Sequence, residues 1–280
     1  MLKIGEYNTL LVDREKDFGF YLIDARTKED VLLPKSLCEG MGIEVGQEVT
    51  VFIYRDSKDR VIATFKKPIA KAGDVAYLKV VHQGEFGAFI DFGLDRDIFV
   101  PLKEQRYKLR TGSKYMFYIY VDKTNRLAAT TEVEPYIEPT EGGAGYKVGD
   151  EVTAMVFSRT PSGTLNVAVE GKYRGLVLAN EYFDEVFPGA ELKVRVRRIY
   201  EDGVIGLTPR KTRLNERDEL QEKIVAYMKK NGGFMAFNDK SKPEDIKATF
   251  GTSKNYFKMA LGGLMKKGEL KQDSEGCKLL

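Results

Sequence analysis

Cysteine and histidine are scarce in this sequence, which limits the metal and covalent chemistry that it can support. The two cysteines, Cys38 and Cys277, lie far apart in the chain, and the single histidine is His82. Widely separated cysteines predict neither a disulfide framework nor a cysteine metal site, and one histidine excludes a multi-histidine site. We therefore expect no metal and no cofactor.

Long apolar runs are absent as well. No stretch approaches the roughly 18 consecutive apolar residues of a membrane span, and residues 1–17 carry charges where a secretory signal needs an apolar segment. A hydrophobic content of 42% beside 31% charged residues is typical of a folded, soluble chain. The sequence thus predicts a cytoplasmic protein that does not enter a membrane.

Groupings of catalytic residues are also missing. His82 has no serine, cysteine or paired carboxylates around it, and no glycine-rich phosphate loop with its lysine occurs. The densest acidic group, Asp91, Asp95 and Asp97, is interpreted as a set of loop residues, because a metal-dependent nuclease needs carboxylates grouped on rigid elements. We predict that the protein is not an enzyme.

What the sequence does contain is an internal repeat. The segment Asp17–Asp24 (DFGFYLID) returns as Glu85–Gly93 (EFGAFIDFG), and Gly46–Thr64 aligns with Gly112–Thr130 without a gap. Each copy predicts a strand, a glycine-containing strand, a short strand ended by proline, and a closing hairpin. Five short strands in about 60 residues are typical of a small closed barrel such as the OB-fold.

Each copy places an aromatic residue three positions after its first phenylalanine, as Phe18 with Tyr21 and Phe86 with Phe89. Residues an odd number apart point to opposite faces of a regular strand. A bulge or a tight bend at the intervening glycine would bring both rings to one surface. The alternative is that all four rings are ordinary core residues.

A third unit starts at Val148 and lacks this aromatic pair. Its closing segment carries Arg195 and Arg197 on one face, which indicates either a stripe that contacts phosphates or an edge strand protected by charge. Pro135–Gly145 separates this unit from the second, and its proline, glycine and acidic residues predict a linker.

From Leu214 the apolar period becomes helical, and the order helix, strand, helix, helix, hairpin predicts a winged helix-turn-helix. Residues 212–280 carry an excess of basic side chains, whereas the remainder is nearly balanced. Lys254 and Lys258 lie one turn apart on the candidate recognition helix. They are candidate phosphate contacts or simply a solvated helix face.

These patterns predict a mostly β protein with a C-terminal α+β domain. Three tandem five-stranded OB barrels would be followed by the winged helix. The predicted domain boundaries are 1–67, 71–134, 146–211 and 213–280.

At this point the residues resemble a known family. The second unit, with Gly73 and Asp74, FGAFIDFG and an Ala-Ala-Thr hairpin end, resembles the ribosomal-protein S1 RNA-binding domain, an OB-fold. Three such units before a winged helix containing Lys242–Ile246 (KPEDI) and Ser253–Lys258 (SKNYFK) are similar to the bacterial conserved virulence factor B family of RNA-binding proteins.

In S1 domains, RNA lies across the barrel face built from the second and third strands. The resemblance therefore implies RNA contacts from the aromatic pairs and from the closing hairpins. The implied residues are Phe18, Tyr21, Phe86 and Phe89 for the aromatic pairs, and Arg60, Asp122 and Arg126 for the hairpins.

Two classes of function remain open. The first is a regulatory protein that binds single-stranded RNA through its barrels, since exposed rings stack on bases and tandem modules gain affinity together. The second is a scaffold that docks on the ribosome or on other proteins, which the near-neutral barrels favour. DNA binding through the winged helix is the weaker alternative, because its candidate recognition helix is only modestly basic.

Overall fold

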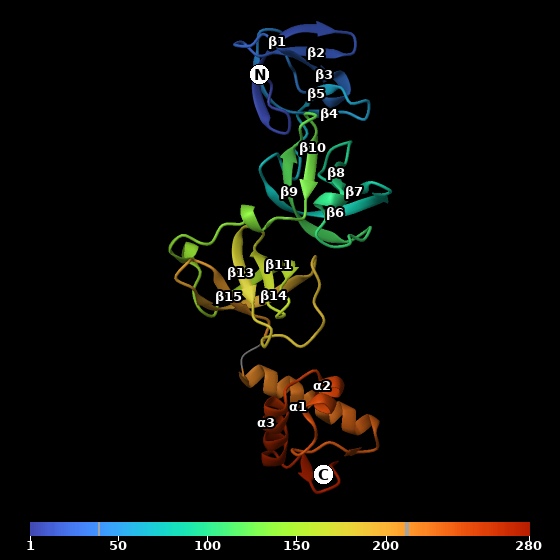
Figure 1. Ribbon diagram of the computed structural model, residues 1–280, viewed down its shortest axis with the longest axis vertical. Helices are drawn as coiled ribbons and strands as arrows, with labels where there is room; N and C mark the ends of the chain where they lie inside the picture. The colour runs from blue at the N-terminus through green and yellow to red at the C-terminus, as the bar shows by residue number, and fades with distance from the viewer. Residues whose placement is uncertain (39, 211–212) are drawn as a thin grey trace.

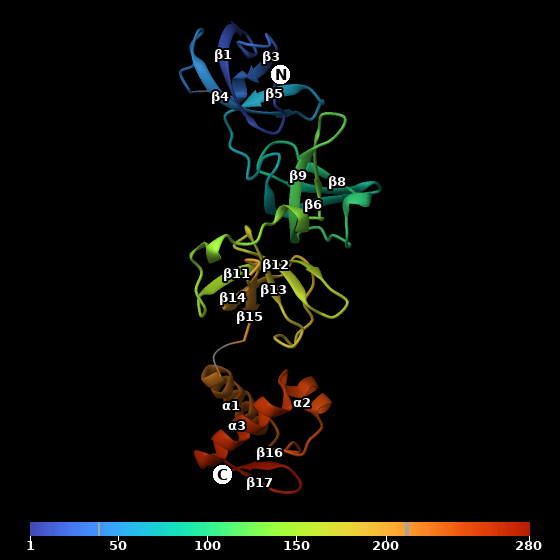
Figure 2. The same ribbon diagram turned by 60° about the vertical axis from the view of Figure 1, so that its left-hand side comes forward.

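The computed structural model describes residues 1–38, 40–210 and 213–280. Three small barrels and a helical domain follow one another from the N-terminus to the C-terminus in a single column (Figure 1). The view turned by 60° shows the same linear order (Figure 2). The predicted boundary at residues 211–213 includes two positions, 211 and 212, that lie outside the described residues.

Each barrel closes from five short strands, as the repeat predicted. Barrel 1 consists of β1 (Tyr7–Lys16), β2 (Gly19–Ile23), β3 (Asp30–Pro34), β4 (Glu48–Arg55) and β5 (Val61–Thr64). Barrel 2 consists of β6 (Val75–Gly84), β7 (Gly87–Asp91), β8 (Ile98–Pro101), β9 (Lys114–Val121) and β10 (Leu127–Thr130). Barrel 3 consists of β11 (Glu151–Arg159), β12 (Leu165–Val169), β13 (Tyr173–Val177), β14 (Glu191–Ile199) and β15 (Ile205–Thr208).

The three barrels share one connectivity. The first three strands form an antiparallel meander, the third strand pairs in parallel with the fifth, and the fourth strand closes the barrel against the first. Alternating side chains of each barrel point inward, so Leu22, Ile90 and Val167 are fully buried at the centre of their strands. The prediction of three OB-type barrels is confirmed.

Barrels 1 and 2 are joined by a shared core. Phe52, Tyr54 and Ile62 of the closing strands of barrel 1 pack into the apolar cluster that fills barrel 2. Backbone hydrogen bonds from Ile69 N to the Phe92 oxygen, 2.7 Å, and from Ala72 N to the Gly5 oxygen, 2.8 Å, fix the connection. Burial of large apolar side chains between the two barrels stabilises their relative position.

The segment Pro135–Gly145 connects barrel 2 to barrel 3 and packs against both of them. The ring of Tyr136 stacks on Tyr118 of β9 with centroids 3.4 Å apart. Ile137 is buried, and Thr140 donates a hydrogen bond of 2.8 Å to the Gly203 oxygen of barrel 3. Proline and glycine set the turns of this segment, but its buried side chains hold it between the two barrels.

The C-terminal domain has the predicted winged-helix order. Its elements are α1 (Arg213–Lys230), β16 (Phe234–Met235), α2 (Pro243–Phe250), α3 (Lys254–Lys266), β17 (Leu270–Gln272) and β18 (Cys277–Leu279). Gly251 ends α2 in the left-handed conformation, φ 65°, and the Ser253 hydroxyl caps α3 by accepting a hydrogen bond from Tyr256 N. Phe257, Leu261 and Leu264 face the domain core.

Among the described residues, no helix is long and apolar enough to span a membrane. Over the same residues, no three histidine, cysteine, aspartate or glutamate side chains are grouped as metal ligands would be.

Candidate nucleic-acid interface

Phe86 lies on a tight hairpin turn and not on a strand. Gly84 pairs with Gly87, so Glu85 and Phe86 form the turn between β6 and β7, and the Phe86 side chain is 75% exposed. Of the two predicted alternatives, a bulge or a tight bend, the structure has the tight turn next to Gly87, and the register shift lies in β6 between Val80 and His82. The two rings share a surface because Phe86 projects from the turn while Phe89 points outward from β7.

Gly87 provides room for a further ring. A Cβ atom at Gly87 would lie 2.7 Å from the Phe99 ring and 2.3 Å from the Val100 oxygen. Phe99 of β8 therefore covers the glycine and packs against Phe89, with centroids 5.2 Å apart. His82 lies in β6 and packs on the other side of Phe89, with ring centroids 5.9 Å apart. Together these rings form a continuous aromatic surface.

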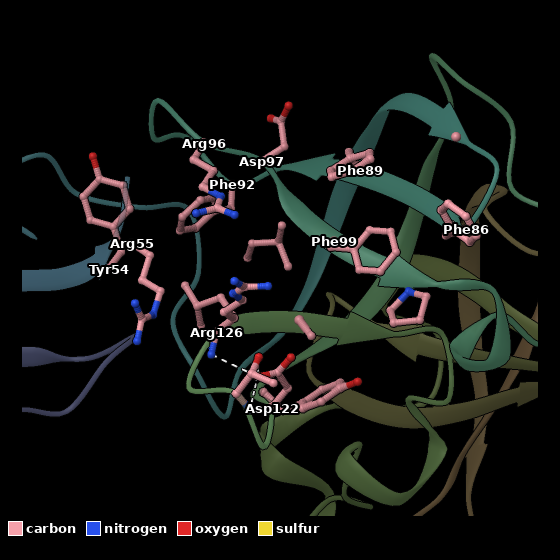
Figure 3. A pocket seen from close by; sticks show the side chains of 18 of the residues that line it. Tyr54, Arg55, Phe86, Phe89, Phe92, Arg96, Asp97, Phe99, Asp122 and Arg126 are labelled. Atoms are coloured by element: carbon pink, nitrogen blue, oxygen red, sulfur yellow. Dashed lines mark hydrogen bonds between the residues drawn. The ribbon is translucent and has the colours of Figure 1, made fainter. Parts of the chain in front are cut away.

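This surface forms one side of an open groove, hereafter the groove, with a volume of about 560 Å³. Figure 3 shows Phe86, Phe89 and Phe99 toward one end and Arg55, Arg96 and Arg126 toward the other. Most of the lining comes from barrel 2, but Tyr54 and Arg55 come from barrel 1. The principal charged and ring-bearing lining residues are Tyr54, Arg55, Phe86, Phe89, Arg96, Asp97, Phe99, Lys103, Tyr120, Asp122 and Arg126.

Asp122 shapes the β9–β10 turn at the edge of the groove. Its carboxylate accepts hydrogen bonds from the Thr124 amide and hydroxyl, at 2.8 and 2.7 Å, and from the Arg126 amide at 3.0 Å. Partial burial raises the pKa of Asp122, but these hydrogen bonds outweigh burial and hold the pKa below its ordinary value. Asp122 is thus an ionised turn residue whose Oδ1 atom accepts all three of these hydrogen bonds.

Arg126 and Arg60 occupy equivalent repeat positions but have different partners. The Arg126 guanidinium donates to both carboxylate oxygens of Asp59, at 3.1 and 2.5 Å, across the boundary between barrels 1 and 2. Arg60 donates to Asp56 within its own hairpin, at 2.9 and 2.7 Å, and does not line the groove. Of these two predicted contacts, only Arg126 is positioned in the groove.

The aromatic pair of barrel 1 lies apart from the groove. Phe18 is on the turn between β1 and β2 and is 56% exposed, and its ring meets the Tyr21 ring edge-on at 6.2 Å. The Arg14 guanidinium lies 4.2 Å from the Tyr21 centroid and is held there by Asp13 and Asp30. One face of Tyr21 is therefore already occupied.

The predicted phosphate contacts outside barrels 1 and 2 are dispersed. Arg195 donates to the Arg210 oxygen at 2.9 Å, and Arg197 forms an ion pair with the largely buried Glu181. Lys254 is the first residue of α3, and Lys258, one turn later, is exposed. The structure does not bring these four residues together with the groove.

Several residues that line the groove were not among the site residues predicted from the sequence. Phe99 alternates with the buried Ile98 and Val100, and that alternation identifies it as an outward-facing ring. Tyr120 is a repeat partner of Tyr54, but the repeat alone does not distinguish the exposed copy from the buried one. Arg55 and Arg96 reach the groove only because two barrels meet, which no local pattern encodes.

The protein families that match this sequence agree with the observed fold. A family model of the S1 domain matches residues 4–66 and 72–132, and a model of the CvfB-like winged helix domain matches residues 222–279. The chain is 33% identical to the uncharacterized protein YitL of Bacillus subtilis, over 98% of this chain and 92% of that protein. It is 28% identical to conserved virulence factor B of Staphylococcus epidermidis, over 88% of this chain and 85% of that protein.

Among solved structures, a similar one is a multidomain protein with nucleic acid binding domains from Streptococcus pneumoniae. It aligns over 99% of this chain and 98% of its own length, with 28% identity and a TM-score of 0.54. The similarity therefore extends through all three barrels and the C-terminal domain.

Proposed function

The chain belongs to the conserved virulence factor B family, and on that premise we propose that it is a regulatory protein without catalytic activity that binds single-stranded RNA in the groove of barrel 2. OB-type barrels bind oligonucleotides on the face that carries the groove here, and winged helices are a common nucleic-acid-binding fold. The proposal assigns the principal site to barrel 2 and treats the other domains as auxiliary.

The observation that carries the proposal is the exposure of Phe86 next to the Phe89–Phe99 pair. A large apolar ring that projects 75% exposed from a turn contributes nothing to the barrel core. Base stacking on such a ring contributes about 1–3 kcal/mol per base to binding. The three rings offer successive positions for bases along one side of the groove.

The same arrangement favours a single strand over a duplex. Bases within a duplex have their faces covered by neighbouring base pairs, whereas unpaired bases can turn toward protein rings. Arg96, Lys103 and Arg126 line the groove beside the rings, and cationic side chains there would follow the phosphates. The choice of RNA over DNA rests on the match to the S1 family model.

The test is a binding titration with a fluorescent oligouridine at several salt concentrations. We expect the Phe86→Ala/Phe89→Ala double variant to lose at least tenfold in affinity, because it removes two stacking positions. The matched control is Phe18→Ala/Tyr21→Ala, which removes the equivalent rings of barrel 1. Circular dichroism of both variants checks that the barrels stay folded.

Equal losses in the two double variants would refute the assignment to barrel 2. If the chain binds oligothymidine as tightly as it binds oligouridine, a preference for RNA is refuted. If the intact chain binds neither oligonucleotide, the protein-docking scaffold becomes the better hypothesis, and the exposed rings become a candidate surface for a protein partner.

A further inference from the structure

The boundary between barrels 1 and 2 gathers three arginines around one carboxylate. Arg126 of barrel 2 donates to both oxygens of Asp59 of barrel 1, and Arg96 of barrel 2 lies 3.4 Å from the same carboxylate. Arg55 of barrel 1 donates to the Asn125 oxygen at 2.9 Å and to the Asp59 main-chain oxygen at 2.7 Å. Arg55, Arg96 and Arg126 are hereafter the arginine cluster.

The cluster holds more positive charge and more donors than its partner can satisfy. A guanidinium has five N–H donors and stays charged at all ordinary pH values. Among the described residues, Asp59 is the carboxylate that accepts hydrogen bonds from these guanidinium groups, and Asp97 and Asp122 line the same groove without accepting from them. Within those same residues, the Nη2 group of Arg55 has no hydrogen-bond acceptor. The site can therefore accept a further anion.

All three arginines line the groove that the aromatic rings border. Figure 3 shows Arg55, Arg96 and Arg126 toward the opposite end from Phe86, with Phe99 between them. Asp59 and Arg96 keep about a third of their side-chain surface exposed, and Arg126 about half, so solvent and ligand reach the cluster. A strand whose bases lie on Phe89 and Phe99 would carry its phosphates toward this end.

The cluster is specific to this boundary. In the repeat, the position of Arg55 is occupied in barrel 2 by Val121, and the position of Arg96 is occupied in barrel 1 by Glu29. Arg126 has an equivalent in Arg60, but Arg55 and Arg96 have no basic equivalent in the other barrel. They occur where the closing hairpin of barrel 1 meets barrel 2.

We infer that barrel 1 completes the RNA site of barrel 2, with Arg55, Arg96 and Arg126 binding a backbone phosphate of the strand whose bases stack on Phe89 and Phe99. This inference rests on the proposed function. Guanidinium groups match phosphate oxygens with paired, planar hydrogen bonds, and a partly desolvated cluster binds phosphate more strongly than a fully solvated lysine. Barrel 1 thus acts through the tip of its closing hairpin and not through Phe18 and Tyr21.

The test measures how the affinity for fluorescent oligouridine depends on salt in the full chain. Each phosphate neutralised on a single strand contributes about 0.7 to the slope of log K against log salt. We expect Arg55→Gln to weaken binding at low salt and to reduce the slope by about that amount. Arg55→Lys keeps the charge and should restore most of the slope. Arg26→Gln removes an exposed arginine of barrel 1 that does not line the groove, and should leave the slope unchanged.

The outcomes separate this inference from the proposed function. If Arg55→Gln keeps the wild-type slope while Phe86→Ala/Phe89→Ala loses affinity, the phosphate site is refuted and the aromatic site stands. If Arg55→Gln and Arg55→Lys lose the slope equally, Arg55 serves only to join the barrels and the inference is refuted. If the intact chain does not bind oligouridine, both fail.

Discussion

Barrels 1 and 2 carry the same repeat, yet among the described residues the aromatic pair of barrel 2 lines the groove and that of barrel 1 does not. Both place a phenylalanine on the turn between their first two strands and a second ring three residues later. In barrel 2 the ring of Phe99 extends this surface, whereas the equivalent residue of barrel 1 is Leu32. In barrel 1, Arg14 covers Tyr21. Leu32 in place of a ring and Arg14 over Tyr21 therefore distinguish the closed surface of barrel 1 from the open stacking surface of barrel 2.

A second difference comes from packing between the barrels. Tyr54 and Tyr120 occupy the same repeat position and both line the groove, but Tyr54 is 2% exposed and packs in the shared core, whereas Tyr120 is half-buried and lies outside that core. Burial raises the pKa of Tyr54 to about 12, with a smaller contribution from Asp95 and Asp56. Equivalent residues thus acquire different roles when one copy of a repeat lies against the next.

The largest expected effect is on stability and distinguishes these two tyrosines. Tyr54→Ala should lower the free energy of unfolding by about 3–5 kcal/mol, because it opens a cavity in the core that joins barrels 1 and 2. Tyr120→Ala should lower it by less than half as much and should weaken oligouridine binding instead. Urea unfolding followed by circular dichroism gives the first quantity, and the fluorescence titration gives the second. Similar losses of unfolding free energy in both variants would contradict the different roles assigned to Tyr54 and Tyr120.

A smaller effect should follow from giving barrel 1 the ring that it lacks. Leu32 is partly exposed and pairs with Tyr21 as Phe99 pairs with Phe89. Leu32→Phe should strengthen oligouridine binding by about 1 kcal/mol, the lower range for one stacked base. Leu32→Met, which has similar volume and no ring, is the control. An unchanged affinity in the phenylalanine variant would show that Arg14 alone closes this surface.

Most of the fold could be predicted from the sequence because several independent local patterns indicate the same structure. Alternating apolar residues, turn glycines and the ungapped repeat all indicate the same five-stranded unit. The change to a helical period marks the winged helix. The segment Pro135–Gly145 was an exception, since its composition indicates a loop while Tyr136, Ile137 and Thr140 make contacts with distant strands.

The candidate site could be predicted only in part. Phe86 and Phe89 follow from the repeat, and Phe99 from strand alternation. Arg55 and Arg96 could not be predicted, because their arrangement around Asp59 depends on how barrels 1 and 2 meet. For the same reason, Arg60 and Arg126 are identical by the repeat and only their partners in the structure separate them.

The smallest expected effect concerns pH and tests the contact between the barrels. Hydrogen bonds from Arg126 hold the pKa of the Asp59 carboxyl below its ordinary value. A carboxyl with a lowered folded-state pKa stabilises the fold above its unfolded value of about 3.9. That contribution is lost as the pH falls through the folded-state pKa. Asp59→Asn should therefore lower the urea midpoint slightly at pH 6.

At pH 3 the same substitution should change the midpoint less than at pH 6, since the carboxyl of the unfolded chain, with a pKa of about 3.9, is then mostly protonated and part of the contribution is lost. The effect is small because the pair is open to solvent, which screens its attraction. Asp17→Asn changes an exposed aspartate on a turn of barrel 1 and controls for net charge. A midpoint difference that is the same at both pH values would mean that the Arg126 contact does not hold barrel 1 against barrel 2. The two barrels would then be joined by the shared core around Tyr54 and by the hydrogen bonds that do not involve the Asp59 carboxylate.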